Sequence, residues 1–156
     1  MNKWKKDEKR KRFFNGLLSY DTACLHRNQY IHGISVLSAG EEKGFGIFAD
    51  EKIRSDQLIC SNLAKPLSNL VDCSDMRLFQ YLFSAPEELP NKSYIIVCGE
   101  MIFLNHCDEP TARVEWRRER SGLLFADLFS VREIDQGGEI TIKYKDIDRY
   151  QSEQLI

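Results

Sequence analysis

The sequence has no long apolar run, only four prolines and three histidines, and no pair of cysteines in C-x-x-C spacing. Without an apolar stretch of about 20 residues, no membrane-spanning helix is expected. The first twelve residues, MNKWKKDEKRKR, lead into only a short apolar segment, so a secretory signal is not expected either. A cytoplasmic location is therefore predicted, with the nucleus open if the source cell has one.

The cysteines are five in number, and their spacing excludes zinc ribbons and thioredoxin-like redox sites. We interpret them as reduced thiols and, Cys107 apart, as small buried side chains. The full set is Cys24, Cys60, Cys73, Cys98 and Cys107.

The net charge is only −2, but it is unevenly distributed. Residues 1–12 hold seven basic and two acidic side chains, and the other 144 residues hold 15 basic and 22 acidic ones. A basic arm of this kind contacts nucleic acid or an acidic partner, or it is a solvated helix end. Twelve residues alone are a weak nucleic-acid signal, which favours the second interpretation.

The 156 residues, 42% of them hydrophobic, are typical of one globular domain. Residues 3–18 are predicted to be helical, because Phe13, Phe14, Leu17 and Leu18 share one helix face. The tail after Lys145 is predicted to form another short helix. From residue 33 on, short β-like runs are separated by turn residues. The expected strands are Ile34–Leu37, Phe45–Ala49, Gln57–Ala64, Tyr94–Val97, Met101–Leu104, Arg113–Trp116, Leu123–Val131 and Glu139–Tyr144.

Two stretches in the middle of the chain are less regular. Ser74 can cap a helix that runs into an apolar strand at Tyr81. Ser84–Lys92 contains two prolines and is interpreted as a loop. The overall prediction is a mainly β domain of several small sheets with a short helix at each end.

The first segment with chemical potential is Lys43 followed by Gly44-Phe45-Gly46 and a β run. Two glycines around an aromatic residue let the backbone approach a ligand closely. The third glycine and the helix of a dinucleotide fingerprint are missing. Taken alone, the segment indicates a bulge or tight turn.

The second and third segments each have a plain structural interpretation. In Phe103–Thr111 an apolar run meets Asn105 and His106, which could cap a turn and satisfy a buried carbonyl. No metal site is expected there, because His26 and His32 lie far back in the sequence. In residues 134–144 a Gly-Gly turn enters an alternating strand that ends at Tyr144, which alone would indicate a hairpin.

Together, and in this order, these segments resemble the SET domain of protein lysine methyltransferases. The family pattern is G-x-G, then Y-L-F, then R-F-x-N-H-S-x-x-P-N, then G-x-E-L-T-x-D-Y. The resemblance spans roughly residues 33–146. It is carried by Gly44-Phe45-Gly46, by Tyr81-Leu82-Phe83, by Phe103-Leu104-Asn105-His106 with Pro110, and by Gly137-Gly138-Glu139-Ile140-Thr141-Ile142-Lys143-Tyr144.

The resemblance implies a SET-type β-clip fold with a C-terminal pseudoknot. In this family the last strand threads beneath a loop and brings the N-H motif beside the final tyrosine. It also implies a domain division into a basic arm and helix (1–32), a SET domain (33–146) and a tail (147–156) that closes the lysine channel around Tyr150.

The implied activity is transfer of a methyl group from S-adenosylmethionine to a lysine amine of a protein substrate, histone-like or other. The resemblance implies that cofactor binding involves Lys43, Gly44, Phe45, Gly46, Asn105, His106 and Tyr144, with the Asn105 amide at the amino-acid end. Tyr144 and Tyr81 are the implied catalytic residues. Tyr81, Phe83, Phe103 and Ile142 are the implied walls of the lysine channel. Ile142 stands where the family often has Phe or Tyr, which leaves room for further methylation.

Four positions depart from the family pattern. Ile102 precedes Phe103 where the arginine is expected, Cys107 replaces serine, Thr111 replaces asparagine and Lys143 replaces aspartate or asparagine. Strand alternation predicts that Lys143 points to the face opposite Tyr144. The departures keep two other hypotheses open: a SET-like binding module without catalysis, and a chromatin or nucleic-acid adaptor led by residues 1–12.

Overall fold

The computed structural model describes residues 28–67, 81–86, 89 and 94–145. The helices expected at residues 3–18 and after Lys145, the basic arm and the tail at Tyr150 lie outside the described residues. Residues 74–80 and most of the Ser84–Lys92 loop lie outside them as well. Within the described part, no helix is long and apolar enough to cross a bilayer.

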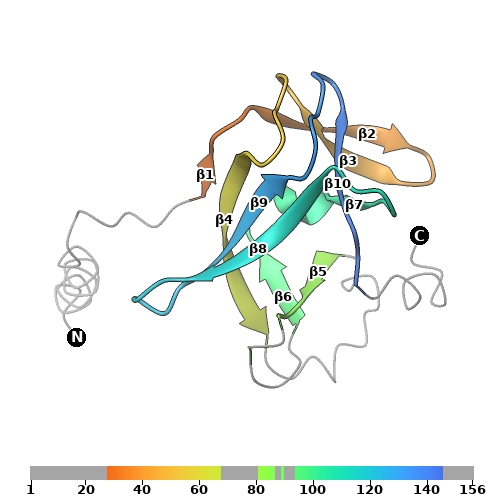
Figure 1. Cartoon of the computed structure of the whole chain (residues 1–156). Helices are drawn as coiled ribbons and strands as arrows, with labels where there is room; N and C mark the ends of the chain where they lie inside the picture. The colour runs from red at the N-terminus through yellow and green to blue at the C-terminus, as the bar shows by residue number, and fades with distance from the viewer. Residues whose placement is uncertain (1–27, 68–80, 87–88, 90–93, 146–156) are drawn as a thin grey trace, which may run out of the picture.

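Ten short strands and one 3-10 helix make up the described fold (Figure 1). In chain order they are β1 (Gln29–Tyr30), β2 (Ile34–Gly40), β3 (Gly44–Ala49), β4 (Leu58–Leu67), β5 (Leu82–Ser84), β6 (Tyr94–Val97), η3 (Glu100–Phe103), β7 (Asn105–His106), β8 (Ala112–Arg118), β9 (Leu124–Ser130) and β10 (Glu139–Ile142).

These strands form two sheets. The larger one has the order β5-β6-β4-β9-β8, with β1 also paired to β4, and all its pairings are antiparallel. The smaller one has the order β2-β3-β10-β7. In it, β10 runs antiparallel to β3 and parallel to β7. The last strand of the described part is thus inserted between two earlier ones, and the expected mainly β fold of SET type is confirmed.

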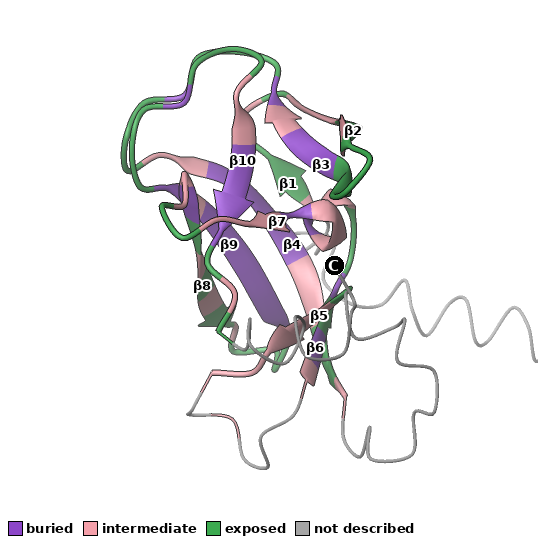
Figure 2. Ribbon diagram, turned by 90° about the vertical axis from the view of Figure 1, so that its right-hand side faces the viewer, coloured by how far each residue is buried: buried purple, intermediate pink, exposed green. Residues whose placement is uncertain are grey.

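The core is built from both sheets. Ile47 and Ile140 of the small sheet and Ile59 and Leu128 of the large sheet are fully buried and belong to one cluster. Figure 2 shows that the buried residues concentrate in β3, β4, β9 and β10. Each such side chain contributes about 1.5–3 kcal/mol of apolar transfer free energy. The packing therefore fixes β10 relative to β3 and to the large sheet.

The interior strand β9 is buried almost along its whole length, yet it contains Asp127. A buried carboxylate is tolerated only when it is paired and hydrogen-bonded. Arg117 Nε lies 2.7 Å from Asp127 Oδ2, and the Ser61 hydroxyl donates to Oδ1 of the same carboxylate. The hydrogen bond of Asp127 raises the pKa of the Arg117 guanidinium. The ion pair of Arg117 and Asp127 thus has a structural role.

Seven of the eight predicted strands correspond to observed ones, and the prediction for Met101–Leu104 was wrong. Residues Glu100–Phe103 form a 3-10 turn, in which the Leu104 amide donates to the Met101 carbonyl at 3.2 Å. Gly99, at φ 97°, allows the sharp entry that L residues rarely adopt. The strand expected to reach Tyr144 ends at Ile142 instead, because the Tyr144 amide donates to the His106 side chain.

Three of the cysteines lie in the described part, and all three are free thiols. Cys60 is buried, and burial raises its pKa to about 12, so it remains a neutral thiol at physiological pH. Cys107 is half-buried. Cys98 is exposed, which differs from the expected burial.

Thr111 connects the segment that follows β7 to β10 by hydrogen bonds. Its hydroxyl accepts from the Thr141 amide at 2.9 Å and donates to the Glu139 carbonyl at 3.2 Å, and its own amide donates to Thr141 Oγ1 at 3.3 Å. The side chain thus completes backbone hydrogen bonds that a neighbouring strand would otherwise supply. This departure from the family pattern has a structural role.

Thr111→Val is expected to destabilise the fold by about 1–3 kcal/mol, because the isosteric change leaves a half-buried amide and carbonyl without their partner. Chemical denaturation measures the effect. Thr111→Ser, which keeps the hydroxyl, is the matched control and should lose much less. A loss in Thr111→Ser as large as that in Thr111→Val would contradict this assignment, because the methyl group that serine lacks would then matter as much as the hydroxyl that valine lacks.

Candidate active site

The insertion of β10 between β3 and β7 brings three distant segments to one place. Thr141 pairs with Asn105 and Ile142 with His106, while Glu139 pairs with Phe48 on the other side. The glycine motif of β3, the Asn-His pair of β7 and the segment ending at Tyr144 are therefore neighbours. The sequence resemblance predicted this convergence.

Asn105 and Glu139 lie directly over the backbone of Gly46. The Asn105 amide nitrogen donates to Glu139 Oε1 at 2.8 Å and to the Phe45 carbonyl at 3.2 Å. A Cβ at position 46 would lie 2.8 Å from Glu139 Oε1 and 2.9 Å from Asn105 Nδ2. These distances are shorter than van der Waals contact, so only glycine lets both side chains occupy this place.

Lys43 completes this group from the turn before β3. Its ammonium lies 3.4 Å from Glu139 Oε2, so the Glu139 carboxylate links Lys43 to Asn105. The family pattern has an arginine before Phe103, and here Ile102 stands in that position. Among the described residues, Lys43 is the cation that pairs with Glu139.

An exposed aromatic lies beside the glycine motif. Phe45 is 61% exposed, and its ring meets that of Phe103 edge-on with centroids 6.3 Å apart. Phe103 was predicted as a channel wall. The structure places it with Phe45, outside the set of residues that line the neighbouring pocket.

His106 and Tyr144 are joined by a hydrogen bond and by a contact between their rings. The Tyr144 amide donates to His106 Nδ1 at 3.0 Å, so this nitrogen is the acceptor. Nε2 lies 3.5 Å from Asp108 Oδ1. The two rings are 5.4 Å apart, and the Tyr144 hydroxyl donates to the Leu104 carbonyl at 2.5 Å.

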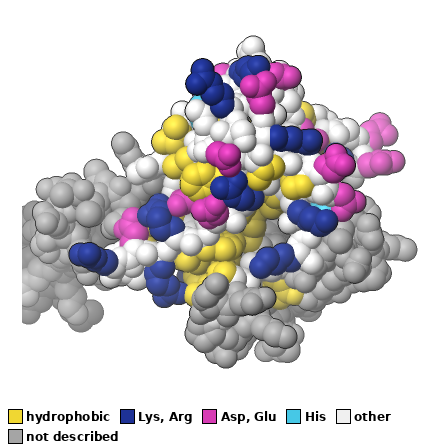
Figure 3. Space-filling view, in the orientation of Figure 1, with side chains coloured by type: hydrophobic (Ala, Val, Ile, Leu, Met, Phe, Trp, Pro, Cys, Tyr) yellow, Lys and Arg dark blue, Asp and Glu magenta, His cyan; other side chains and the backbone are white. Residues whose placement is uncertain are grey.

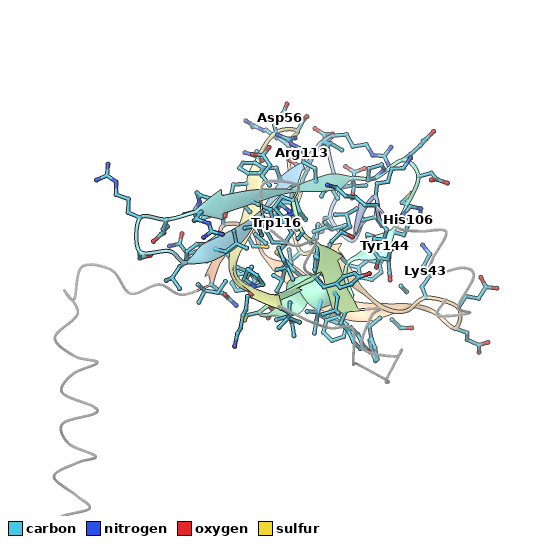
Figure 4. The ribbon with its side chains drawn as sticks, turned by 90° about the horizontal axis from the view of Figure 1, so that it is seen from below. Lys43, Asp56, His106, Arg113, Trp116 and Tyr144 are labelled. Atoms are coloured by element: carbon cyan, nitrogen blue, oxygen red, sulfur yellow. The ribbon has the colours of Figure 1, made fainter. Side chains whose placement is uncertain are left out.

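Tyr144 opens onto a pocket with a volume of about 250 Å³. The predicted residues Tyr81, Phe83 and Ile142 line it together with Tyr144. The pocket extends beneath β8, where the Trp116 ring meets Phe83 edge-on at 6.1 Å. In Figure 4, Lys43, His106 and Tyr144 lie on one side of the molecule, and Trp116 is further away. The site thus combines an apolar pocket with a polar group of residues, Gly46, Asn105 and Glu139, which we call the shelf.

Lys143 also borders this pocket. Strand alternation predicts that its side chain points to the face opposite Tyr144, and because β10 ends at Ile142 this orientation stays a prediction. Lys143 is exposed, and its ammonium lies 3.8 Å from Asp108. Its charge is therefore at the mouth of the pocket and in contact with solvent.

The comparison with protein families matches a SET domain over residues 44–145. The chain belongs to the SET domain family. This confirms the family resemblance of the sequence motifs and places the protein in a family of methyltransferases. No curated protein matches the chain.

The SET fold is also seen in a solved structure from Plasmodium falciparum, of a protein assigned as a candidate histone methyltransferase. It matches with a TM-score of 0.57 and 22% identity, over 72% of this chain and 97% of the other. At this identity the likeness concerns the fold alone. It covers a larger part of the chain than the four sequence motifs do.

Several residues of this SET domain site were not among the sequence-predicted site residues. Glu139 belongs with Asn105, His106 and Tyr144 to the motif core that favours activity, and only its position over Gly46, which follows from the register of β10 with β3, was not predicted. The Leu104 carbonyl, which accepts from Tyr144, carries no sequence signal. Trp116 and Val114 enter the pocket because even-numbered β8 residues share a face, which the alternation of β8 could have indicated.

Proposed function

We propose that this SET domain is an S-adenosylmethionine-dependent protein-lysine N-methyltransferase. The observation that carries the proposal is that Tyr144 lines an apolar pocket together with Leu104 and Ile142, which lead into β7: Leu104 directly precedes Asn105, and Ile142 pairs with His106. In this proposal the apolar pocket binds the lysine side chain, and the polar shelf of Gly46, Asn105 and Glu139 binds the methyl donor. Methyl donation is the chemistry that the cofactor supplies when bound.

The residues of the shelf fit the amino-acid end and the purine of this cofactor. Gly46 has no side chain to cover its backbone, so a ligand can approach it closely. The Asn105 amide is held in one orientation by hydrogen bonds to Glu139 and to the Phe45 carbonyl. Lys43 offers a half-exposed ammonium for a carboxylate. His106 presents backbone groups beside β10, and the exposed ring of Phe45 provides an apolar surface.

The pocket residues have a different task. A lysine attacks only as a neutral amine, and apolar walls such as Phe83 and Ile142 disfavour its ammonium form by desolvation. Aromatic side chains partly oppose this through cation–π attraction. With the cofactor bound, the Tyr144 oxygen and the Leu104 carbonyl would offer partial negative charge to the methyl group as the positive charge passes from sulfur to the lysine nitrogen. Much of the rate is expected to come from alignment of the reacting atoms.

Transfer of a labelled methyl group from S-adenosylmethionine to a lysine-rich protein mixture tests this function. The expected result is label that hydrolysis recovers as methyl-lysine, and no label when the lysines of the mixture are acetylated beforehand. Cofactor binding without transfer to any protein would instead favour a binding module that has lost catalysis. Which protein is methylated and the compartment in which this occurs stay predictions, as do contacts made by residues 1–12.

A further inference from the structure

The charged residues among the described lining of the pocket are all basic. Arg113, Lys143 and Lys145 line it, and none of the described lining residues is acidic. Figure 3 shows an apolar surface with both basic and acidic side chains at its margin. The basic lining contrasts with residues 13–156 as a whole, which hold 15 basic and 22 acidic side chains.

The three cations differ in how far neighbouring carboxylates already compensate them. Arg113 is held by Glu115 at 2.9 Å and Asp56 at 3.3 Å, and it lies over the Phe129 ring. Its charge is largely neutralised. The two lysines are therefore the cations that remain available to a ligand.

Lys143 has only a weak partner. Its ammonium and the Asp108 carboxylate are 3.8 Å apart, and both side chains are mostly in solvent. Exposed pairs of this kind contribute about 0–1 kcal/mol, so a carboxylate on a ligand can replace Asp108 at little cost. Lys145 forms no ion pair with any residue in the described part of the chain. Both lysines adjoin Tyr144, and Lys143 stands where the family pattern has aspartate or asparagine.

We propose that the pocket selects a target lysine with acidic residues on either side. This rests on the proposed function, in which the target lysine enters beside Tyr144. Carboxylates next to the lysine would then meet Lys143 and Lys145, while basic neighbours would be repelled by the same two ammonium groups. The substrate class is thus an acidic lysine-containing segment, and a strongly basic tail is disfavoured.

The test measures peptide binding rather than turnover. Short fluorescein-labelled peptides carry a central lysine with a pair of aspartates, serines or arginines on each side. Their dissociation constants for the full chain are measured by anisotropy with S-adenosylhomocysteine present. The aspartate peptide is expected to bind about tenfold more tightly than the arginine peptide at low salt. Added salt should reduce this ratio.

Two charge-reversal variants test whether Lys143 causes the preference for acidic flanking residues. Lys143→Glu should remove or invert the preference, whereas Lys65→Glu, at an exposed lysine of β4 outside the pocket lining, should preserve it. Equal binding of the three peptides, binding of none, or an unchanged ratio in Lys143→Glu would overturn the proposal. Methyl transfer to the same peptides is measured separately. Transfer without a flank preference would contradict this inference alone, and absence of transfer with an intact preference would contradict only the proposed function.

Discussion

Tyr144→Phe is expected to abolish most methyl transfer while the fold and cofactor affinity are kept. The change removes only the hydroxyl that donates to the Leu104 carbonyl. The ring contact with His106 and the hydrogen bond from the Tyr144 amide to His106 Nδ1 do not depend on that oxygen. Removal of one oriented polar group from a catalytic site typically lowers the rate about 10²–10³-fold.

Single-turnover transfer measures this loss, and calorimetric titration and thermal unfolding check cofactor binding and stability. Tyr30→Phe is the matched control, because it also removes a hydrogen-bonded hydroxyl, here one that donates to Glu100 outside the pocket lining. That variant should transfer methyl groups at nearly the original rate. An unchanged rate in Tyr144→Phe would remove Tyr144 from the mechanism.

Gly46→Ala is expected to weaken S-adenosylmethionine binding about 10–100-fold. The new methyl group would lie 2.8 Å from Glu139 Oε1 and 2.9 Å from Asn105 Nδ2, so both side-chain ends must move. Their mutual hydrogen bond is then lost, and Asn105 no longer keeps the orientation that the shelf requires. Loss of one or two oriented hydrogen bonds corresponds to about 1–3 kcal/mol.

Gly40→Ala separates this effect from general damage to the β2–β3 hairpin. Gly40 has a φ of 106°, so alanine is strained there, but no atom lies within 4 Å of its Cβ position. The control should lose stability and retain cofactor affinity. If Gly46→Ala bound the cofactor as tightly as the original protein, the close approach at Gly46 would have no role in binding.

The strands of this domain were largely predictable because their alternation and turn residues are local. The exceptions have non-local causes. Met101–Leu104 is as apolar as a strand, but the positive φ of Gly99 and the pairing of Asn105 with Thr141 leave those residues in a 3-10 turn. β10 stops before Tyr144 because a histidine side chain takes the next amide hydrogen. Neither interaction is visible in residue spacing.

Most residues of the candidate site were predictable from the sequence, but their positions relative to one another were predictable only in part. The family pattern named Gly46, Asn105, His106 and Tyr144, and the structure brings them together around β10. It did not indicate that Lys43 would pair with Glu139 where an arginine is missing, or that Thr111 would fasten β10. These contacts depend on register and side-chain reach, which only the folded chain defines.

Titration of the purified protein with S-adenosylmethionine by calorimetry tests the central claim most directly. The account predicts saturable binding that weakens about 10–100-fold in Asn105→Ala, because that variant loses the amide held between Glu139 and Phe45. The titration is repeated with a lysine-rich protein mixture, because a bound substrate lysine could complete the cofactor site. No binding to folded protein under either condition, or equal binding by Asn105→Ala, would contradict the account.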